Sequence, residues 1–151
     1  MNANPNTQKE IKQVVAILLN KYHNRDPFFI ARSIGIECTL LDFNGELPAF
    51  SERRNVDDRG RIYINQKYGS YARKILCGHE LGHLCLHGDY KDTFFDSDIE
   101  PIKEYEANYF AVMLMPYIIS NKTILHFSIE AFNRYMVHRV NYAERFDIIK
   151  L

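Results

Sequence analysis

The segment His79-Glu80-Leu81-Gly82-His83 contains the residue types best suited to metal chemistry. On an α-helix, residues four apart lie on one face about 5 to 6 Å apart. His79 and His83 can therefore both bind one ion, with Zn–N distances of about 2.0 Å. Glu80 is rotated by about 100° from His79, which brings its carboxylate beside the ion. A bound zinc ion lowers the pKa of water, and the carboxylate can then take its proton as general base. The segment therefore predicts zinc-dependent hydrolysis with Glu80 as the catalytic residue.

The helix that carries this segment is predicted to run from Ser70, as its cap, to His87, with Gly88 as a left-handed exit. Its side chains are apolar on nearly all sides, which predicts a central, buried helix. The motif can arise by chance on an ordinary buried helix, but buried His and Glu side chains need partners, and a metal ion satisfies three of them at once. Gly78 and Gly82 each cost about 1 kcal/mol relative to Ala inside a helix, so they predict that another element packs closely there.

A catalytic zinc site has three protein ligands and one open position, so a third ligand is required. Asp89, six residues after His83, fits sites in which a turn brings the third ligand back, but those sites need Gly where this chain has Leu86. His87 is expected at the helix end, where an imidazolium interacts favourably with the helix dipole. These two residues are therefore weak candidates.

Glu104 and Glu106 are the stronger candidates for the third ligand. Both lie on a helix predicted over residues 102–115, which ends before Pro116. The two glutamates flank the apolar stripe of this helix on opposite sides at similar angles. Periodicity therefore leaves both open.

The sequence HELGHLCLH, followed by EYEANYFAVMLMP, resembles the ImmA/IrrE family of gluzincin-like zinc metallopeptidases. In that family HELGH is joined by a downstream ExEANxFAxxLLxP segment, and the resemblance extends over about residues 10–117. It implies one Zn²⁺ per chain, with His79, His83 and Glu106 as ligands and Glu80 as the catalytic base. Glu104 and Asp89 are then fallback ligands.

The resemblance also implies a class of substrate. Members of the family cleave helix-turn-helix repressors of mobile elements or stress regulons, so a protein substrate such as a transcriptional repressor is expected, in a bacterium or its phage. The alternative is a zinc-containing binding module that recognises a repressor or toxin without cutting it. Retention of Glu80 favours the enzyme.

The remaining pattern predicts an α+β fold dominated by helices, with a small antiparallel sheet and a central HExxH helix. The resemblance implies that this fold is a zincin-like metallopeptidase domain. Helices are expected over residues 7–22, from a Thr7 capping box, and over residues 27–34, between Asp26 and Gly35. Strands are expected over residues 36–43 and 61–65, on either side of a polar segment rich in turn formers.

The second of these strands has a candidate role in substrate binding. As an edge strand it could pair with an extended peptide through its main chain; a place inside the sheet is the equal alternative. The candidate substrate-binding residues are Arg61, Ile62, Tyr63, Ile64 and Asn65.

The C-terminal segment is predicted to be helical, with Ser128 as a cap before residues 130–138. Its default role is to complete the core through Phe127, Ile129, Phe132 and Met136. A DNA-binding helix-turn-helix over residues 120–151 is a weaker alternative, because no turn glycine separates two helices. We expect a single metallopeptidase domain over residues 1–151, with a core of about 7–117 and a helical C-terminal extension of about 118–151.

Charge and composition narrow the class of protein further. Nineteen basic and nineteen acidic residues give a formal net charge of zero, which makes direct nucleic-acid binding unlikely as the main function. The N-terminus has no export signal, and no apolar run is long enough to span a membrane. Three cysteines without CxxC spacing argue against a cysteine zinc site. We therefore expect a cytoplasmic protein without a membrane partner.

Overall fold

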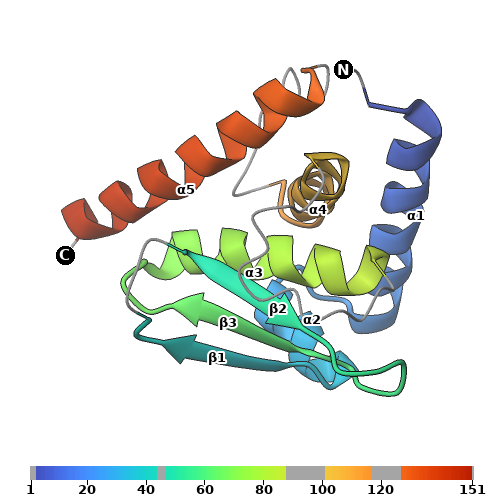
Figure 1. The fold of residues 1–151 in the computed structure, drawn as a ribbon, viewed down its shortest axis with the longest axis horizontal. Coiled ribbons are helices and arrows are strands. Elements are labelled where there is room, and N and C mark those ends of the chain that lie inside the picture. Colours follow the sequence, from blue (N-terminus) through green and yellow to red (C-terminus); the bar gives the residue numbers. More distant parts are fainter. Residues whose placement is uncertain (1–2, 44–46, 88–100, 117–126, 151) are drawn as a thin grey trace.

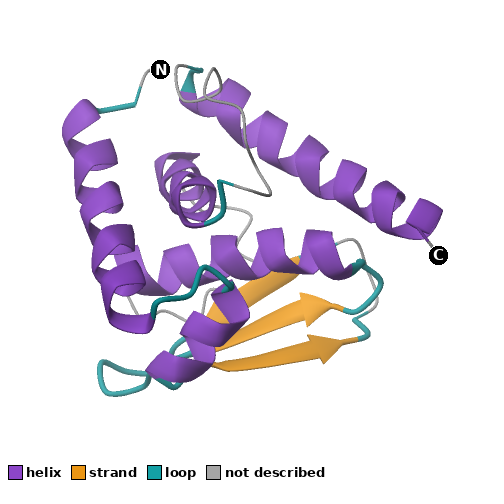
Figure 2. Ribbon diagram, turned by 180° about the vertical axis from the view of Figure 1, so that it is seen from behind, coloured by secondary structure: helices purple, strands orange, loops and turns teal. Residues whose placement is uncertain are grey.

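The computed structural model describes residues 3–43, 47–87, 101–116 and 127–150. Within these ranges it has a mixture of helices and strands in which the helices dominate, as predicted (Figures 1 and 2). The elements are α1 (Pro5–Tyr22), α2 (Pro27–Ile34), β1 (Glu37–Leu41), β2 (Ala49–Glu52), β3 (Arg61–Asn65), α3 (Ser70–Leu86), α4 (Pro101–Leu114) and α5 (Ile129–Lys150). No helix among the described residues is both long and apolar enough to cross a bilayer.

The three strands form a mixed sheet in the order β1-β3-β2. β1 pairs with β3 in parallel and β2 pairs with β3 in antiparallel orientation, so the prediction of an antiparallel sheet is wrong for the first pair. The reason is β2, which the sequence did not predict because its four residues lie in a polar, turn-rich segment. The chain reverses direction at β2 and again before β3, which leaves β3 parallel to β1.

β3 lies inside the sheet, which confirms one of the two alternatives for residues 61–65 and contradicts the other, a substrate-binding edge strand. The Asn65 N–H donates to the Pro48 carbonyl on the β2 side at 2.8 Å, and the Gln66 N–H donates to the Leu41 carbonyl on the β1 side at 2.9 Å. Hydrogen-bonding directions alternate along a strand, so residues 61, 63 and 65 bond toward β2, and 62 and 64 toward β1. Both edges of β3 are therefore in use.

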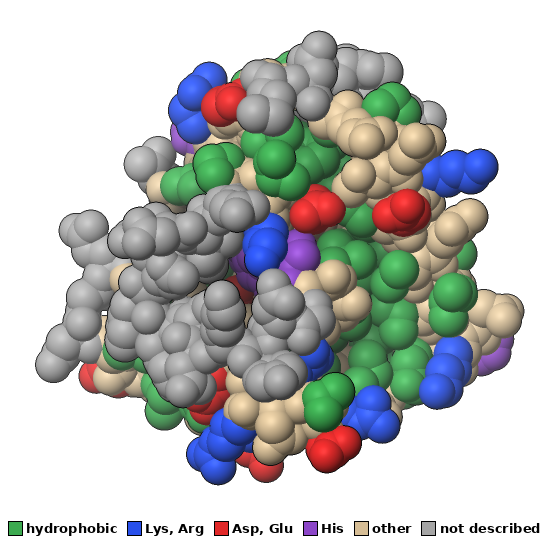
Figure 3. Space-filling view, turned by 45° about the vertical axis from the view of Figure 1, so that its right-hand side comes forward, with side chains coloured by type: hydrophobic (Ala, Val, Ile, Leu, Met, Phe, Trp, Pro, Cys, Tyr) green, Lys and Arg blue, Asp and Glu red, His purple; other side chains and the backbone are tan. Residues whose placement is uncertain are grey.

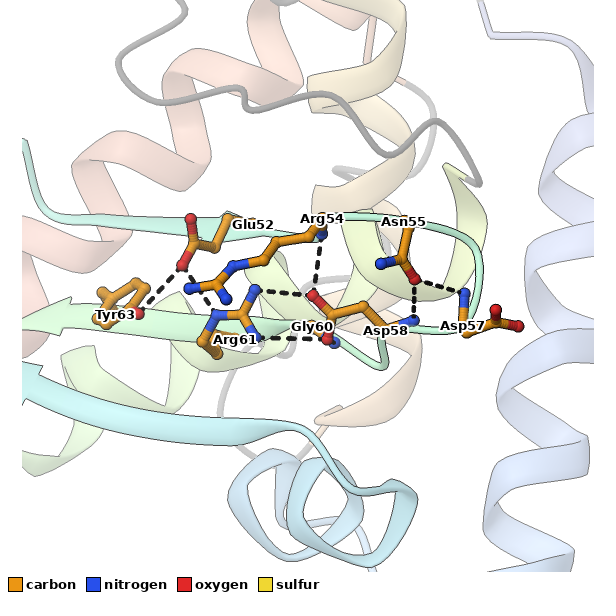
Figure 4. Close-up of polar contacts among 8 residues, drawn as sticks. All are labelled: Glu52, Arg54, Asn55, Asp57, Asp58, Gly60, Arg61 and Tyr63. Atoms are coloured by element: carbon orange, nitrogen blue, oxygen red, sulfur yellow. Dashed lines mark hydrogen bonds and ion pairs between the residues drawn. The ribbon is translucent and has the colours of Figure 1, made fainter.

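A polar cluster fixes the connection between β2 and β3 (Figure 4). Arg61 lies between two carboxylates, with Nε 2.8 Å from Oε1 of Glu52 and Nη2 2.7 Å from Oδ2 of Asp58. The Tyr63 hydroxyl donates to the same Glu52 oxygen at 3.1 Å. Hydrogen bonds from Arg61 and from two backbone N–H groups hold the pKa of Asp58 well below its usual range. The edge strand β2 is thereby held in one register.

The helix starts differ in part from the predictions. α1 begins at Pro5, because the Asn4 side chain accepts from the Asn6 N–H at 2.9 Å and Pro suits the first helical position, so the Thr7 start is wrong. α3 starts after Gly69 without a side-chain cap, so Ser70 is its first residue and not its cap. The prediction for α2 is confirmed: Asp26 caps it, and Gly35 ends it with a φ of 101°.

α3 is the central helix, between the sheet on one side and α4 and α5 on the other (Figures 1 and 2). The close packing predicted at its glycines is confirmed, because a Cβ on Gly82 would lie 3.1 Å from both Cα and the carbonyl oxygen of Ala107 in α4. A Cβ on Gly78 would meet the Met115 methyl group and Ala111. The close approach of the two helices at these glycines brings the N-terminal half of α4 against the histidines of α3.

α5 packs against both α3 and α4. Its predicted core contacts are confirmed for Ile129, Phe132 and Met136, which are buried, but Phe127 is exposed. The Ser128 hydroxyl accepts from the Ala131 N–H at 3.2 Å, which confirms the predicted cap. Residues 129–150 form one continuous helix, so the described part of residues 120–151 contains no helix-turn-helix; the rest of that segment lies outside the described residues.

Candidate metal centre

Three side chains from two helices converge on one point. His79 and His83 come from α3 and Glu104 from the first turn of α4. The two Nε2 atoms are 3.1 Å apart, and the Glu104 oxygens lie 2.8 Å from Nε2 of His83 and 3.3 Å from Nε2 of His79. Two ligand atoms of a tetrahedral zinc ion lie about 3.3 Å apart. The three separations are therefore close to those of a zinc site.

The structure does not bring Glu106 to this group, although the resemblance ranks it first. Its Oε1 lies 3.2 Å from Nε2 of His87. Residues two apart on a helix differ in direction by about 200°, so only one of Glu104 and Glu106 can face the histidine pair. The geometry reverses their order and favours Glu104. Asp89, the other fallback ligand, lies outside the described residues.

Each histidine makes a second hydrogen bond through its other ring nitrogen. Nδ1 of His79 lies 2.7 Å from Oδ1 of Asn108, which is four residues after Glu104 and so on the same face of α4. Nδ1 of His83 lies 2.9 Å from Nδ1 of His87. Such contacts fix the orientation of metal-binding imidazoles.

His87 lies at the C-terminal end of α3, as predicted, but its ring also contacts other side chains. Its backbone N–H donates to the His83 carbonyl at 2.9 Å, which ends α3, and its ring lies between His83 and Glu106. The spacing of four residues from His83 is the signal that places the two rings side by side. His87 and Glu106 are therefore outer contacts of the candidate site.

The electrostatics of the two histidines differ. Burial lowers the pKa of His79, but the hydrogen bond to Glu104 and the charges of Glu104 and Glu80 outweigh it and raise the pKa to about 9. Burial lowers the pKa of His83 to about 4 despite its bond to Glu104. Burial also opposes ionisation of Glu104, yet hydrogen bonds from both histidines hold its pKa well below the usual range. The Glu104 carboxylate of this group is thus partly exposed, stays ionised and attracts positive charge.

Glu80 is 6% exposed, and its Oε2 atom has no hydrogen-bond partner among the described residues. Burial raises its pKa to about 7, against the opposing charge of His79. An unpaired buried carboxylate oxygen is costly, so this atom fits a site that also holds a cation and water. Two imidazoles and a carboxylate form a ligand set known in catalytic zinc sites. The residues present therefore fit zinc.

The surface over this region contains exposed histidine atoms. Figure 3 shows histidine side chains at the surface, close to acidic and basic ones. Side-chain exposures of 17% for His79, 13% for His83 and 35% for Glu104 show that all three side chains are partly accessible to solvent. The candidate site therefore combines partly exposed ligand side chains with the buried carboxyl group of Glu80, the next residue after His79.

Comparisons with known proteins show the family to which the chain belongs. The chain is 32% identical over 109 residues to the uncharacterized immunity region protein 2 of Bacillus phage phi105, and this match covers 70% of the chain and 67% of that protein. The comparison with solved structures found no match. The model of the M78 peptidase family, described as the IrrE N-terminal-like domain, matches residues 31–149. This range includes both helices that carry the site, and the chain belongs to the IrrE-like M78 peptidase family.

Proposed function

We propose that this protein is a zinc-dependent endopeptidase that cuts a regulatory protein. The observation that carries the proposal is the convergence of His79, His83 and Glu104, with the buried Glu80 carboxylate next to them in sequence. The family supports a peptidase-type hydrolase, and the ligand set supports one zinc ion per chain.

The residues divide the chemistry between them. His79, His83 and Glu104 would hold the zinc ion, which when bound polarises the scissile carbonyl and acidifies water. Glu80 takes a proton from the attacking water and delivers it to the leaving amine. Burial raises the pKa of Glu80 to about 7 in the metal-free protein, and the charge of a bound zinc ion would lower it again, toward the carboxylate form that a general base needs.

β2 is the proposed docking strand for the substrate, in place of β3, because no other described strand pairs with its outer edge. Phe50 and Glu52 pair with Tyr63 and Arg61, whose main-chain groups bond toward β2. By alternation, the main-chain groups of Ala49 and Ser51 point away from β3. β2 is also the strand on the side of α3 and α4 (Figure 1). An extended peptide can add there by main-chain hydrogen bonds.

The proposed substrate is a helix-turn-helix repressor of a mobile element, cut in the bacterial cytoplasm. The phage relative supports a regulatory context, because its description places it in an immunity region. We also propose that residues 1–151 act as one domain, because α5 packs on both helices that carry the site.

Metal analysis and cleavage together test this function. Wild type and Glu80→Gln are purified, zinc per chain is measured by mass spectrometry, and both are incubated with a proteome-derived peptide library and with purified repressors. We expect one zinc in both proteins and new N-termini only with wild type. Zinc without cleavage of any substrate would favour the binding module. Absence of zinc after supplementation would rule out the peptidase.

A further inference from the structure

A line of hydrogen bonds connects the candidate site to α5. Nδ1 of His79 lies 2.7 Å from Oδ1 of Asn108, and Nδ2 of Asn108 donates to Oδ1 of Asn133 at 2.9 Å. Nδ2 of Asn133 in turn donates to the carbonyl oxygen of Pro101 at 3.1 Å. The line thus starts on α3, crosses α4 and α5, and ends on the first residue of α4.

The Pro101 carbonyl sets the direction of the whole line, because a carbonyl oxygen can only accept. The amino group of Asn133 must face it, so the oxygen of Asn133 faces Asn108. The amino group of Asn108 must then face Asn133, which leaves its oxygen toward His79. That oxygen requires a proton on Nδ1 of His79, and the neutral ring then has a free lone pair on Nε2, the atom that faces His83 and Glu104.

The opposite orientation of the Asn108 amide would prevent His79 from binding zinc through Nε2. An amide has nearly the same shape when its oxygen and nitrogen are exchanged, so packing alone does not fix it. If the Asn108 amino group faced His79, the neutral ring would carry its proton on Nε2 and could not bind metal there. The hydrogen bond to Asn133 is what distinguishes the two orientations.

The part of α5 that carries Asn133 is anchored in the core. The preceding residue, Phe132, is fully buried, and its ring lies 5.2 Å from that of Tyr105 in an edge-on arrangement. Asn108 is only 5% exposed, so water has little access to replace the partner of its amino group. α5 is therefore placed to do more than cover the core.

We propose that Asn133 is a positioning residue of the metal site, which acts through Asn108 to hold His79 in the orientation and tautomer that bind zinc. This inference rests on the proposed zinc site and extends it to α5. Asn133 touches neither metal nor substrate.

Zinc affinity, measured by competition with a chelating dye, tests the proposal on Asn133→Ala, with exposed Arg134→Ala as the matched control on the same helix. We expect Asn133→Ala to bind zinc about 10-fold more weakly, which is the lower end of the range for mutations of residues that hydrogen-bond to a metal ligand. We expect no change for the control. Asn133→Asp keeps an oxygen acceptor for the Asn108 amino group, so its zinc affinity should fall less than that of Asn133→Ala. The melting temperature of each metal-free variant reports its folding.

Asn108→Asp separates positioning from packing. A carboxylate offers an oxygen in either orientation and needs no partner to fix it. In that background Asn133→Ala should change the zinc affinity by less than about two-fold, which a double-mutant cycle measures. An unchanged affinity in Asn133→Ala, or an equal loss in both backgrounds, would overturn the proposal. Absence of zinc in wild type would instead overturn the site itself.

Discussion

The Glu104 carboxylate lies 2.8 Å from Nε2 of His83, whereas the Glu106 carboxylate, two residues further along α4, contacts His87. We therefore predict that Glu104→Ala loses zinc, with affinity reduced by more than about 100-fold, because only two ligands remain. Glu106→Ala should keep close to one zinc per chain. Metal content by mass spectrometry after dialysis checks this. Zinc loss with Glu106 but not Glu104 would restore the order that the resemblance implied.

His87 is expected to support the site from outside. Its ring contacts Nδ1 of His83 at 2.9 Å, so His87→Ala should leave His83 less well oriented and weaken zinc binding by about 10- to 100-fold. His138→Ala removes an exposed histidine from α5 and serves as the control. Chelator competition measures both. Equal affinities for the two variants would show that the contact has no effect on metal binding.

The edge of β2 can be tested with proline. Ser51→Pro removes an N–H that points away from β3, so it should lower cleavage by at least about 10-fold while zinc content and fold remain. Leu40→Pro is the matched control, because its N–H points outward from β1 on the far side of the sheet. Cleavage assays with circular dichroism distinguish the outcomes. The docking strand is not β2 if both variants cleave equally.

The two glycines of α3 should respond differently to alanine. Gly82→Ala places a methyl group 3.1 Å from the Ala107 backbone, so we expect it to lower the free energy of unfolding by about 1 to 3 kcal/mol. In Gly78→Ala the new methyl group meets the flexible end of the Met115 side chain. The gain in helix propensity of about 1 kcal/mol should offset the cost of moving that side chain. Urea unfolding measures both variants. A more stable Gly82→Ala would show that α3 and α4 are further apart.

Asp58 predicts a dependence of stability on pH. Its folded-state pKa lies below the ordinary value of 3.8, so its contribution is present above about pH 4 and is lost as the pH falls further. Asp58→Asn should therefore lower the urea midpoint at pH 7, and the difference from wild type should shrink toward pH 3. Asp57→Asn, which changes an exposed neighbour, is the control. A difference that stays constant with pH would exclude the ion pair with Arg61 as its cause.

Local patterns in the sequence determined most helices and which helix carries the candidate metal ligands. Asp26 and Gly35 mark the ends of α2 because their side chain and backbone act within one helical turn. His79 and His83 share a face because the spacing of four residues is itself helical geometry. These features needed no knowledge of the rest of the chain.

Only the tertiary structure decided which groups face one another across elements. The choice between Glu104 and Glu106 depends on how α4 is rotated against α3, and that rotation is set by contacts such as Gly82 with Ala107. The place of β3 inside the sheet depends on β2, whose four residues are too few and too polar to show a strand pattern. The link from Asn133 to His79 joins residues 54 positions apart, and such pairings depend on packing between distant segments that a local pattern does not encode.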